Sequence, residues 1–222
     1  MKLLNVQKAR SIWLLEVQDL NPTGFDLWPM TAAIQNRYNF GKAPSREQSR
    51  VNNEGGVQFA DGSFVLADSR RIAISALSIY NDGFVADTRT DSFATDEFLE
   101  DVLHFCINTF SLTYDSQTRK KRGYLSELIV TTERRLDSVG DRLASFASTL
   151  SEYMGGATSS PFEVEAVRFS ADHAIQGRTS PFSIERQART PFAKNRYYSQ
   201  APLTTIHHLD VLSKFENIVL AD

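Results

Sequence analysis

Four histidines and one cysteine are the side chains of this chain best suited to metal binding or nucleophilic chemistry. The histidines are His104, His173, His207 and His208, and the cysteine is Cys106. His207 and His208 are adjacent, so on a helix their side chains diverge by about 100° and do not readily share a metal ion. No third or fourth ligand can be assigned beside Asp172 and His173. We therefore predict no metal centre and no cofactor.

Carboxylates crowd into one stretch, at Asp87, Asp91, Asp96, Glu97, Glu100 and Asp101. Paired acids can bind a divalent cation or act as acid and base, but these lie where a helix is predicted to begin, and the helix dipole favours negative charge there. Glu163, Glu165 and Glu185 lack the lysine of a metal-dependent nuclease site. We assign no catalytic residue. An enzyme with an active site scattered in sequence remains an alternative.

Residues 178–198 combine cations with aromatic rings. The cations are Arg178, Arg186, Arg189, Lys194 and Arg196, against the single acid Glu185, and the rings are Phe182, Phe192, Tyr197 and Tyr198. Arginine and tyrosine dominate the hot spots of protein interfaces, while cations and rings together also bind single-stranded nucleic acid. Because the net charge is -3, we favour a protein partner. The predicted contacts are Arg186, Arg189, Phe192, Lys194, Arg196, Tyr197 and Tyr198.

The predicted function is therefore that of a non-catalytic protein-binding or assembly subunit of a larger complex, with self-association as one form of it. A single-stranded nucleic-acid-binding protein is the first alternative. The second basic feature, at residues 119–122, is expected to be a solvated loop.

Composition places the chain among ordinary globular proteins. It has 222 residues, of which 41% are hydrophobic and 23% are charged, which argues against disorder. A single cysteine excludes an intramolecular disulfide. The N-terminus lacks the apolar run of a signal peptide, and no window reaches membrane-spanning length. We therefore expect a cytoplasmic protein without a membrane partner.

The most readable stretch runs from residue 55 to residue 110. We predict a four-stranded meander over residues 57–88, with a two-residue turn at Asp61-Gly62 that sets Phe59 opposite Phe64. A three-residue turn at residues 81–83, with Gly83 in the left-handed conformation, would pair Tyr80 with Phe84. Gly83→Val is expected to cost more than about 1 kcal/mol.

A helix is predicted over residues 96–109, capped by Thr95. Its apolar residues recur at helical spacing, and they include Cys106. We therefore expect Cys106 to be a buried, unreactive thiol. The helix should pack on the sheet through this face.

The remaining pattern predicts further strands at residues 11–17, 124–133, 162–169 and 182–188, with residues 189–200 irregular. Three further helices are expected. The first spans residues 29–38, and the second runs from residue 137 or 138 to about 154, with an inward face made of Val139, Leu143, Phe146, Leu150 and Met154. The third follows Pro202, with an inward face made of Leu203, Ile206, Leu209, Leu212, Phe215 and Val219. Residues 41–56 should form a polar loop. The predicted fold is α+β: a mostly antiparallel sheet with three long amphipathic helices packed on it and one short one. We expect one domain, with two βαββα halves at residues 1–112 and 123–222 sharing one core.

Overall fold

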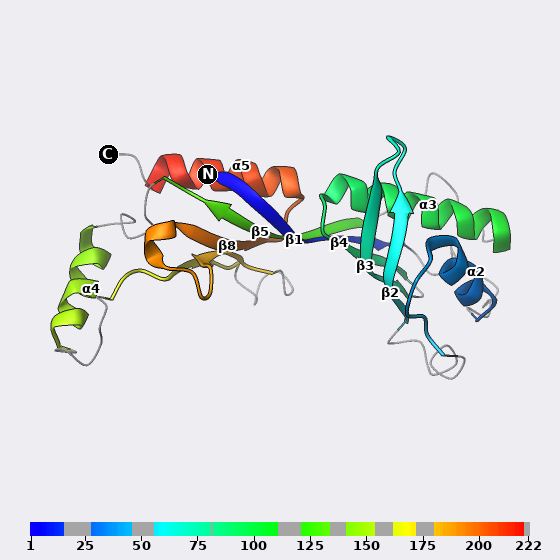
Figure 1. Ribbon diagram of the computed structural model, residues 1–222, viewed down its shortest axis with the longest axis horizontal. Coiled ribbons are helices and arrows are strands. Elements are labelled where there is room, and N and C mark those ends of the chain that lie inside the picture. Colours follow the sequence, from blue (N-terminus) through cyan, green and yellow to red (C-terminus); the bar gives the residue numbers. More distant parts are fainter. Residues whose placement is uncertain are drawn as a thin grey trace. The chain divides into compact units, whose positions relative to one another are not determined.

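The computed structural model describes residues 1–15, 28–45, 56–80, 82–110, 121–133, 141–153, 162–171 and 180–219. The strands are β1 (Lys2–Leu14), β2 (Val57–Val65), β3 (Arg71–Tyr80), β4 (Gly83–Thr88), β5 (Lys121–Thr131), β6 (Ala166–Phe169), β7 (Phe182–Arg186) and β8 (Arg196–Ala201). The helices are α2 (Trp28–Tyr38), α3 (Ser92–Phe110), α4 (Asp141–Tyr153) and α5 (Thr205–Val219), with a short 3-10 turn, η2 (Phe192–Lys194). The predicted α+β class with antiparallel strands is confirmed. Figure 1 shows these elements.

The chain divides into two compact units. Residues Lys8–Leu125 form what we call the N-terminal unit, and Met1–Gln7 with Ser126–Asp222 form the C-terminal unit. β1 and β5 therefore each contribute residues to both. Along the chain, β1-α2-β2-β3-β4-α3 is followed by β5-α4-β6-β7-β8-α5. Each run has one more strand than the predicted βαββα pattern, and each unit has its own cluster of buried apolar side chains.

The strand order in the N-terminal unit is β2-β3-β4-β1. Three strands, not four, span residues 57–88, because β2 continues through Asp61 and Gly62 and pairs with β3 as Phe59↔Leu77 and Phe64↔Ile72. The predicted turn at Asp61-Gly62 is therefore wrong. Asp61 has a positive φ of 59°, although the register is the same on both sides of it, with Ala60↔Ala76 and Gly62↔Ile74. The dipeptide forms an irregularity within a strand.

The turn between β3 and β4 also differs from the prediction. Tyr80 pairs with Gly83 and Ile79 with Phe84, which leaves residues 81 and 82 as the connection in place of three residues. Gly83 is still required, for another reason. A Cβ on Gly83 would lie 1.9 Å from the carbonyl oxygen of Trp13 on β1, so the residue permits close approach of the two strands.

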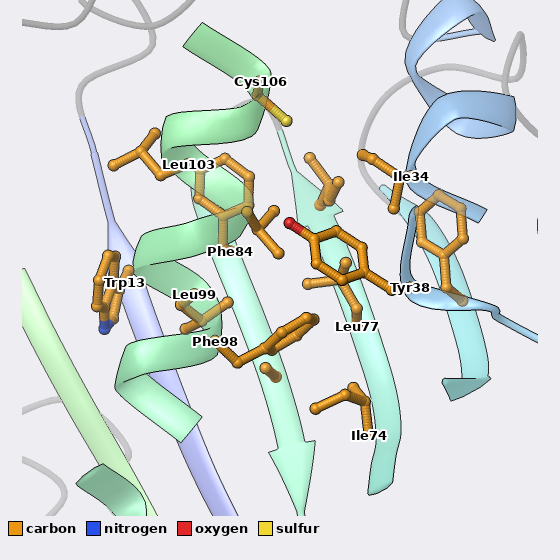
Figure 2. Close-up of a cluster of buried hydrophobic side chains, with 14 of the residues drawn as sticks. Trp13, Ile34, Tyr38, Ile74, Leu77, Phe84, Phe98, Leu99, Leu103 and Cys106 are labelled. Atoms are coloured by element: carbon orange, nitrogen blue, oxygen red, sulfur yellow. The ribbon is translucent and has the colours of Figure 1, made fainter. Parts of the chain in front are cut away.

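The core of the N-terminal unit lies between its sheet and the helices α2 and α3. Leu77 and Phe84 point from the strands toward Phe98 and Leu103 of α3, as Figure 2 shows. Tyr38 extends from α2 against Phe98, with their ring centroids 5.1 Å apart in an edge-to-face arrangement. This arrangement confirms the predicted apolar face of α3 and its packing on the sheet.

The start of α3 is earlier than predicted. The backbone N–H of Ala94 donates to Asp91 Oδ1 at 2.9 Å, so Asp91 caps the helix. Thr95 lies inside the helix and is fully buried. Its hydroxyl lies 2.8 Å from that of Thr88 and 3.3 Å from the carbonyl oxygen of Ala9. Thr95 is therefore not the cap as predicted, and it instead makes a polar contact between the helix and the sheet.

In the C-terminal unit the strand order is β5-β8-β7-β6, and α5 lies along one face of β5 and β8 (Figure 1). The segment predicted to be irregular contains β8, whose buried residues Tyr197, Ser199 and Ala201 alternate with more exposed ones. Leu212 and Phe215 of α5 pack inward as predicted. Ile206 does not, because 70% of its surface is exposed.

The helix α4 departs from the predicted packing. Its apolar residues Leu143, Phe146 and Leu150 lie on the surface among the described residues, and Phe146 is 61% exposed. Val139 and Met154, predicted to share this face, lie outside the described residues. Only part of the expected set of long helices therefore packs on a sheet.

Candidate functional site

The β7–β8 loop, residues 187–195, holds three of the seven predicted contact residues, and the other four lie on the strands at its ends. It is closed at its base by the backbone N–H of Gln187, which donates to the carbonyl oxygen of Arg196 at 3.0 Å. A turn follows, in which Thr190 N–H donates to the carbonyl oxygen of Gln187. The 3-10 turn η2 ends at Asn195, whose φ of 46° is left-handed. The loop therefore has a defined backbone path.

Arg186 lies beneath this loop and not on its surface. Only 7% of the residue is exposed. Its Nη2 donates to Glu163 Oε2 at 2.8 Å, and its Nη1 donates to the carbonyl oxygen of Phe192 at 3.0 Å. The guanidinium carbon lies 4.2 Å from the Phe192 ring centroid and 5.4 Å from that of Tyr197. The direct partner contact predicted for Arg186 is corrected: the side chain supports the loop from inside.

Tyr197 is likewise part of the interior. It is fully buried in the cluster formed with Leu128, Ile184 and Leu212, so it offers a partner no surface. Tyr198 points to the other face of β8 and is half-buried. Its pKa is raised by burial and by the nearby carboxylates of Glu127 and Glu185. The phenol is therefore neutral at physiological pH.

Four of the predicted residues remain exposed on the loop or next to it: Arg189, Phe192, Lys194 and Arg196. Phe192 has one ring face over the Arg186 guanidinium and is 39% exposed. Arg189 has a φ of 61°, which is uncommon for a residue with a side chain. The same short segment thus exposes three cations and one ring, and Arg186 fixes the position of that ring.

Unpaired buried polar atoms gather at the same loop. Arg186 Nε, Gln187 Oε1 and Asn195 Oδ1 have no hydrogen-bond partner within the described residues, and the fourth such atom is Ser11 Oγ in the other unit. A buried polar atom without a partner costs about 1–3 kcal/mol. Such violations are expected mainly at functional or strained positions, which singles out this loop.

His208 was missed by the sequence reasoning. It is fully buried, with Nδ1 2.6 Å from Ser126 Oγ and Nε2 2.9 Å from Ser199 Oγ. Ser199 donates its own proton to the carbonyl oxygen of Ser183 at 2.7 Å, so its oxygen accepts from Nε2–H and Nδ1 accepts from Ser126. Burial lowers the pKa of His208 to about 4. A signal existed, because His208 lies one helical turn before Leu212 on the buried face of α5.

The clustered carboxylates have structural partners. Arg10 makes a bidentate pair with Asp87, with both distances 2.7 Å. Asp96 accepts from Trp13 Nε1 and from the hydroxyl of Tyr124, each at 2.9 Å. Arg37 and the Tyr38 hydroxyl donate to Asp101, from the helix α2. These acids therefore tie elements together.

Other candidate groups are also accounted for. Cys106 is buried, as predicted, and burial raises the pKa of its thiol to about 12. Among the described residues no group of histidine, cysteine, aspartate and glutamate side chains has the geometry of a metal site. Of the basic run, residues 119 and 120 lie outside the described part, while the Arg122 guanidinium carbon lies 4.8 Å from the Trp13 ring centroid.

Comparison with known proteins gives no function. No family model matches the chain, and no curated protein matches it. Among solved structures, the chain is similar to "Methanococcus jannaschii TBP", with a TM-score of 0.46 and 10% sequence identity over 100% of this chain and 98% of that chain. We therefore draw the function from the chain's own residues.

What the exposed groups can do follows from their chemistry. Arg189, Lys194 and Arg196 are basic side chains that act as hydrogen-bond donors only, and Phe192 supplies an apolar ring. Such a set binds anions and covers apolar surface. Within the described residues, no helix is both long and apolar enough to cross a membrane.

Proposed function

We propose that this chain is a non-catalytic binding or assembly subunit that contacts a protein partner through the β7–β8 loop, in the cytoplasm. The observation that carries the proposal is the exposed ring of Phe192, which the buried Arg186 fixes, on a segment that also exposes Arg189, Lys194 and Arg196. Aromatic and arginine side chains supply most of the energy of protein interfaces. A side chain ordered before binding loses less entropy when the complex forms.

The exposed apolar side chains of α4 support the same function. Leu143, Phe146 and Leu150 recur at helical spacing, and each exposes a third or more of its surface. A row of large apolar side chains on a surface marks an interaction site more often than chance exposure does. A protein partner can cover such a row, and the polar β7–β8 loop then supplies specificity.

The test is recovery of a partner from the native source. The tagged full-length chain is compared with Phe192→Ser and with the matched control Phe93→Ser, whose ring is 73% exposed on α3 in the other unit. We expect a partner that co-purifies with the wild type and the control and is lost with Phe192→Ser. Light scattering shows whether that partner is a second copy. Identical sets of proteins from all three chains, or no partner at all, would contradict the proposal.

A further inference from the structure

The charges around Phe192 define the chemistry of the partner, if the proposed function holds. Residues 187–196 include Arg189, Lys194 and Arg196 and contain no acid. The three side chains are exposed. Arg186 differs from them, because its charge is paired with Glu163 in the interior. A complementary surface must therefore be negative.

Phosphates and carboxylates could both supply that charge, and the surroundings of the loop favour carboxylates. A nucleic-acid strand needs a cationic path along several phosphates. Following β8 away from Arg196, the next side chain on the same face is Tyr198, which lies near Glu127 and Glu185 and has its pKa raised by them. A phosphate track would meet these acids. Among the described residues, the run of positive charge along this face of β8 thus ends at Arg196, which suits a few discrete carboxylates.

The helix α4 is connected to the same loop through Ser151. The backbone N–H of Phe162 donates to Ser151 Oγ on α4 at 2.7 Å. The next residue, Glu163, makes the ion pair with Arg186, which in turn holds Phe192. The helix and the loop are therefore linked through residues 162 and 163 by direct bonds. A partner that engages both must present apolar side chains beside acidic ones.

We infer that the partner binds with an acidic amphipathic helix. Its apolar side covers Phe146 and Leu150 of α4 together with Phe192, and its carboxylates pair with Arg189, Lys194 and Arg196. An amphipathic helix carries both groups on adjacent sides with a period of about 3.6 residues, and helix binding through apolar anchors is a recurrent mode of recognition.

The test uses the full-length chain and four labelled probes. The first is a designed helical peptide with leucine on one side and glutamate on the flanks. Two matched peptides carry glutamine or lysine in place of glutamate, and the fourth probe is an oligothymidylate of about 20 nucleotides. We expect the glutamate peptide to bind at least about tenfold more tightly than the other three, with an affinity that falls as salt rises.

Variants locate the binding. The loop variant Arg189→Gln/Lys194→Gln/Arg196→Gln should weaken the glutamate peptide about tenfold or more. Lys42→Gln/Arg71→Gln/Arg89→Gln removes the same charge from exposed residues of the N-terminal unit and should leave binding unchanged. Phe146→Ser/Leu150→Ser should weaken every leucine-bearing peptide, because it removes the apolar contact. Circular dichroism and melting confirm that each variant is folded.

Several outcomes overturn the inference. One is equal binding of the glutamine peptide, and another is the absence of binding by the glutamate peptide. Tighter binding of the oligothymidylate that is lost in the loop variant would assign the surface to nucleic acid. If the native partner is lost with Phe192→Ser while the glutamate peptide does not bind, the proposed function stands and the acidic helix is wrong. If neither the native partner nor the glutamate peptide responds to the loop variants, the proposed function and the acidic helix are both wrong.

Discussion

The guanidinium of Arg186 lies 4.2 Å below the ring of Phe192 and donates a hydrogen bond to the carbonyl oxygen of the same residue. One buried cation thus fixes both the side chain and the backbone of the exposed ring. The contact residue and its support are separated by only five intervening positions in sequence, and composition alone cannot distinguish them. Their burial distinguishes the two roles: the buried Arg186 is the support, and the exposed Phe192 is the contact residue.

Removing the Arg186 charge should destabilise the fold strongly. In Arg186→Met the apolar part of the side chain is kept, but the ion pair with Glu163 at 2.8 Å is lost. Breaking a buried ion pair from one side costs about 3–5 kcal/mol. Urea unfolding should show this loss, and adding Glu163→Gln should recover more than about 1 kcal/mol of it. Arg189→Met, at an exposed position, should change stability by less than about 0.5 kcal/mol. Strict additivity of the two buried substitutions would contradict the pairing.

Gly83→Ala should also be costly, because the added Cβ would lie 1.9 Å from the carbonyl oxygen of Trp13. Either the β1–β4 pairing or the turn must move, and strain of this kind is expected to exceed about 2 kcal/mol. Gly41→Ala is the control, since its Cβ would meet the nearest atom at 3.5 Å. Thermal melting of both variants measures the difference. Equal melting midpoints would show that the close approach is easily relieved.

The class of fold and the core-facing residues of α3 could be predicted because they depend on local periodicity. Strand register could not be predicted from local periodicity. Asp61-Gly62 has the composition of a tight turn, yet Gly62 is required because a Cβ there would lie 2.4 Å from the ring of Phe40. Phe40 is distant in sequence, and no local rule shows that it packs against this strand. Tertiary packing therefore overrides the turn preference.

The strand β8 was missed for a related reason. Its buried face carries Tyr197, Ser199 and Ala201, so the expected alternation of large apolar residues is absent. Ser199 is buried because it contacts His208 from α5, a pairing that only the fold reveals. In the candidate site, the residue types were predicted, but the division between support and exposed surface depends on the direction in which each β8 side chain points.

Cys106 should resist modification in the folded protein. It is the only cysteine of the chain, it is fully buried, and burial raises the pKa of its thiol to about 12. Since the thiolate is the reactive form, labelling with a disulfide reagent at pH 8 should be at least about 100-fold slower than in denaturant. Rapid labelling under native conditions would show that α3 opens readily.

Acid should destabilise the protein through His208. Burial lowers its pKa from 6.5 to about 4, so the folded form stays neutral while the unfolded chain takes up a proton as pH falls below about 6.5. The stability from this residue is present above pH 6.5, decreases between pH 6.5 and 4, and changes no further below that range. The linkage amounts to about 2 kcal/mol between pH 7 and pH 5.

Other groups also titrate in this range, so the measurement is a difference between two proteins. Urea unfolding of the wild type and of His208→Gln at pH 7 and pH 5 gives the contribution of the imidazole. The amide of glutamine keeps a donor and an acceptor near Ser126 and Ser199 but does not titrate. The variant should be less stable than the wild type at pH 7 and should lose less stability on acidification. Parallel losses in both proteins would mean that His208 gains a proton in the folded state without cost, and the assigned hydrogen-bond directions would then be wrong.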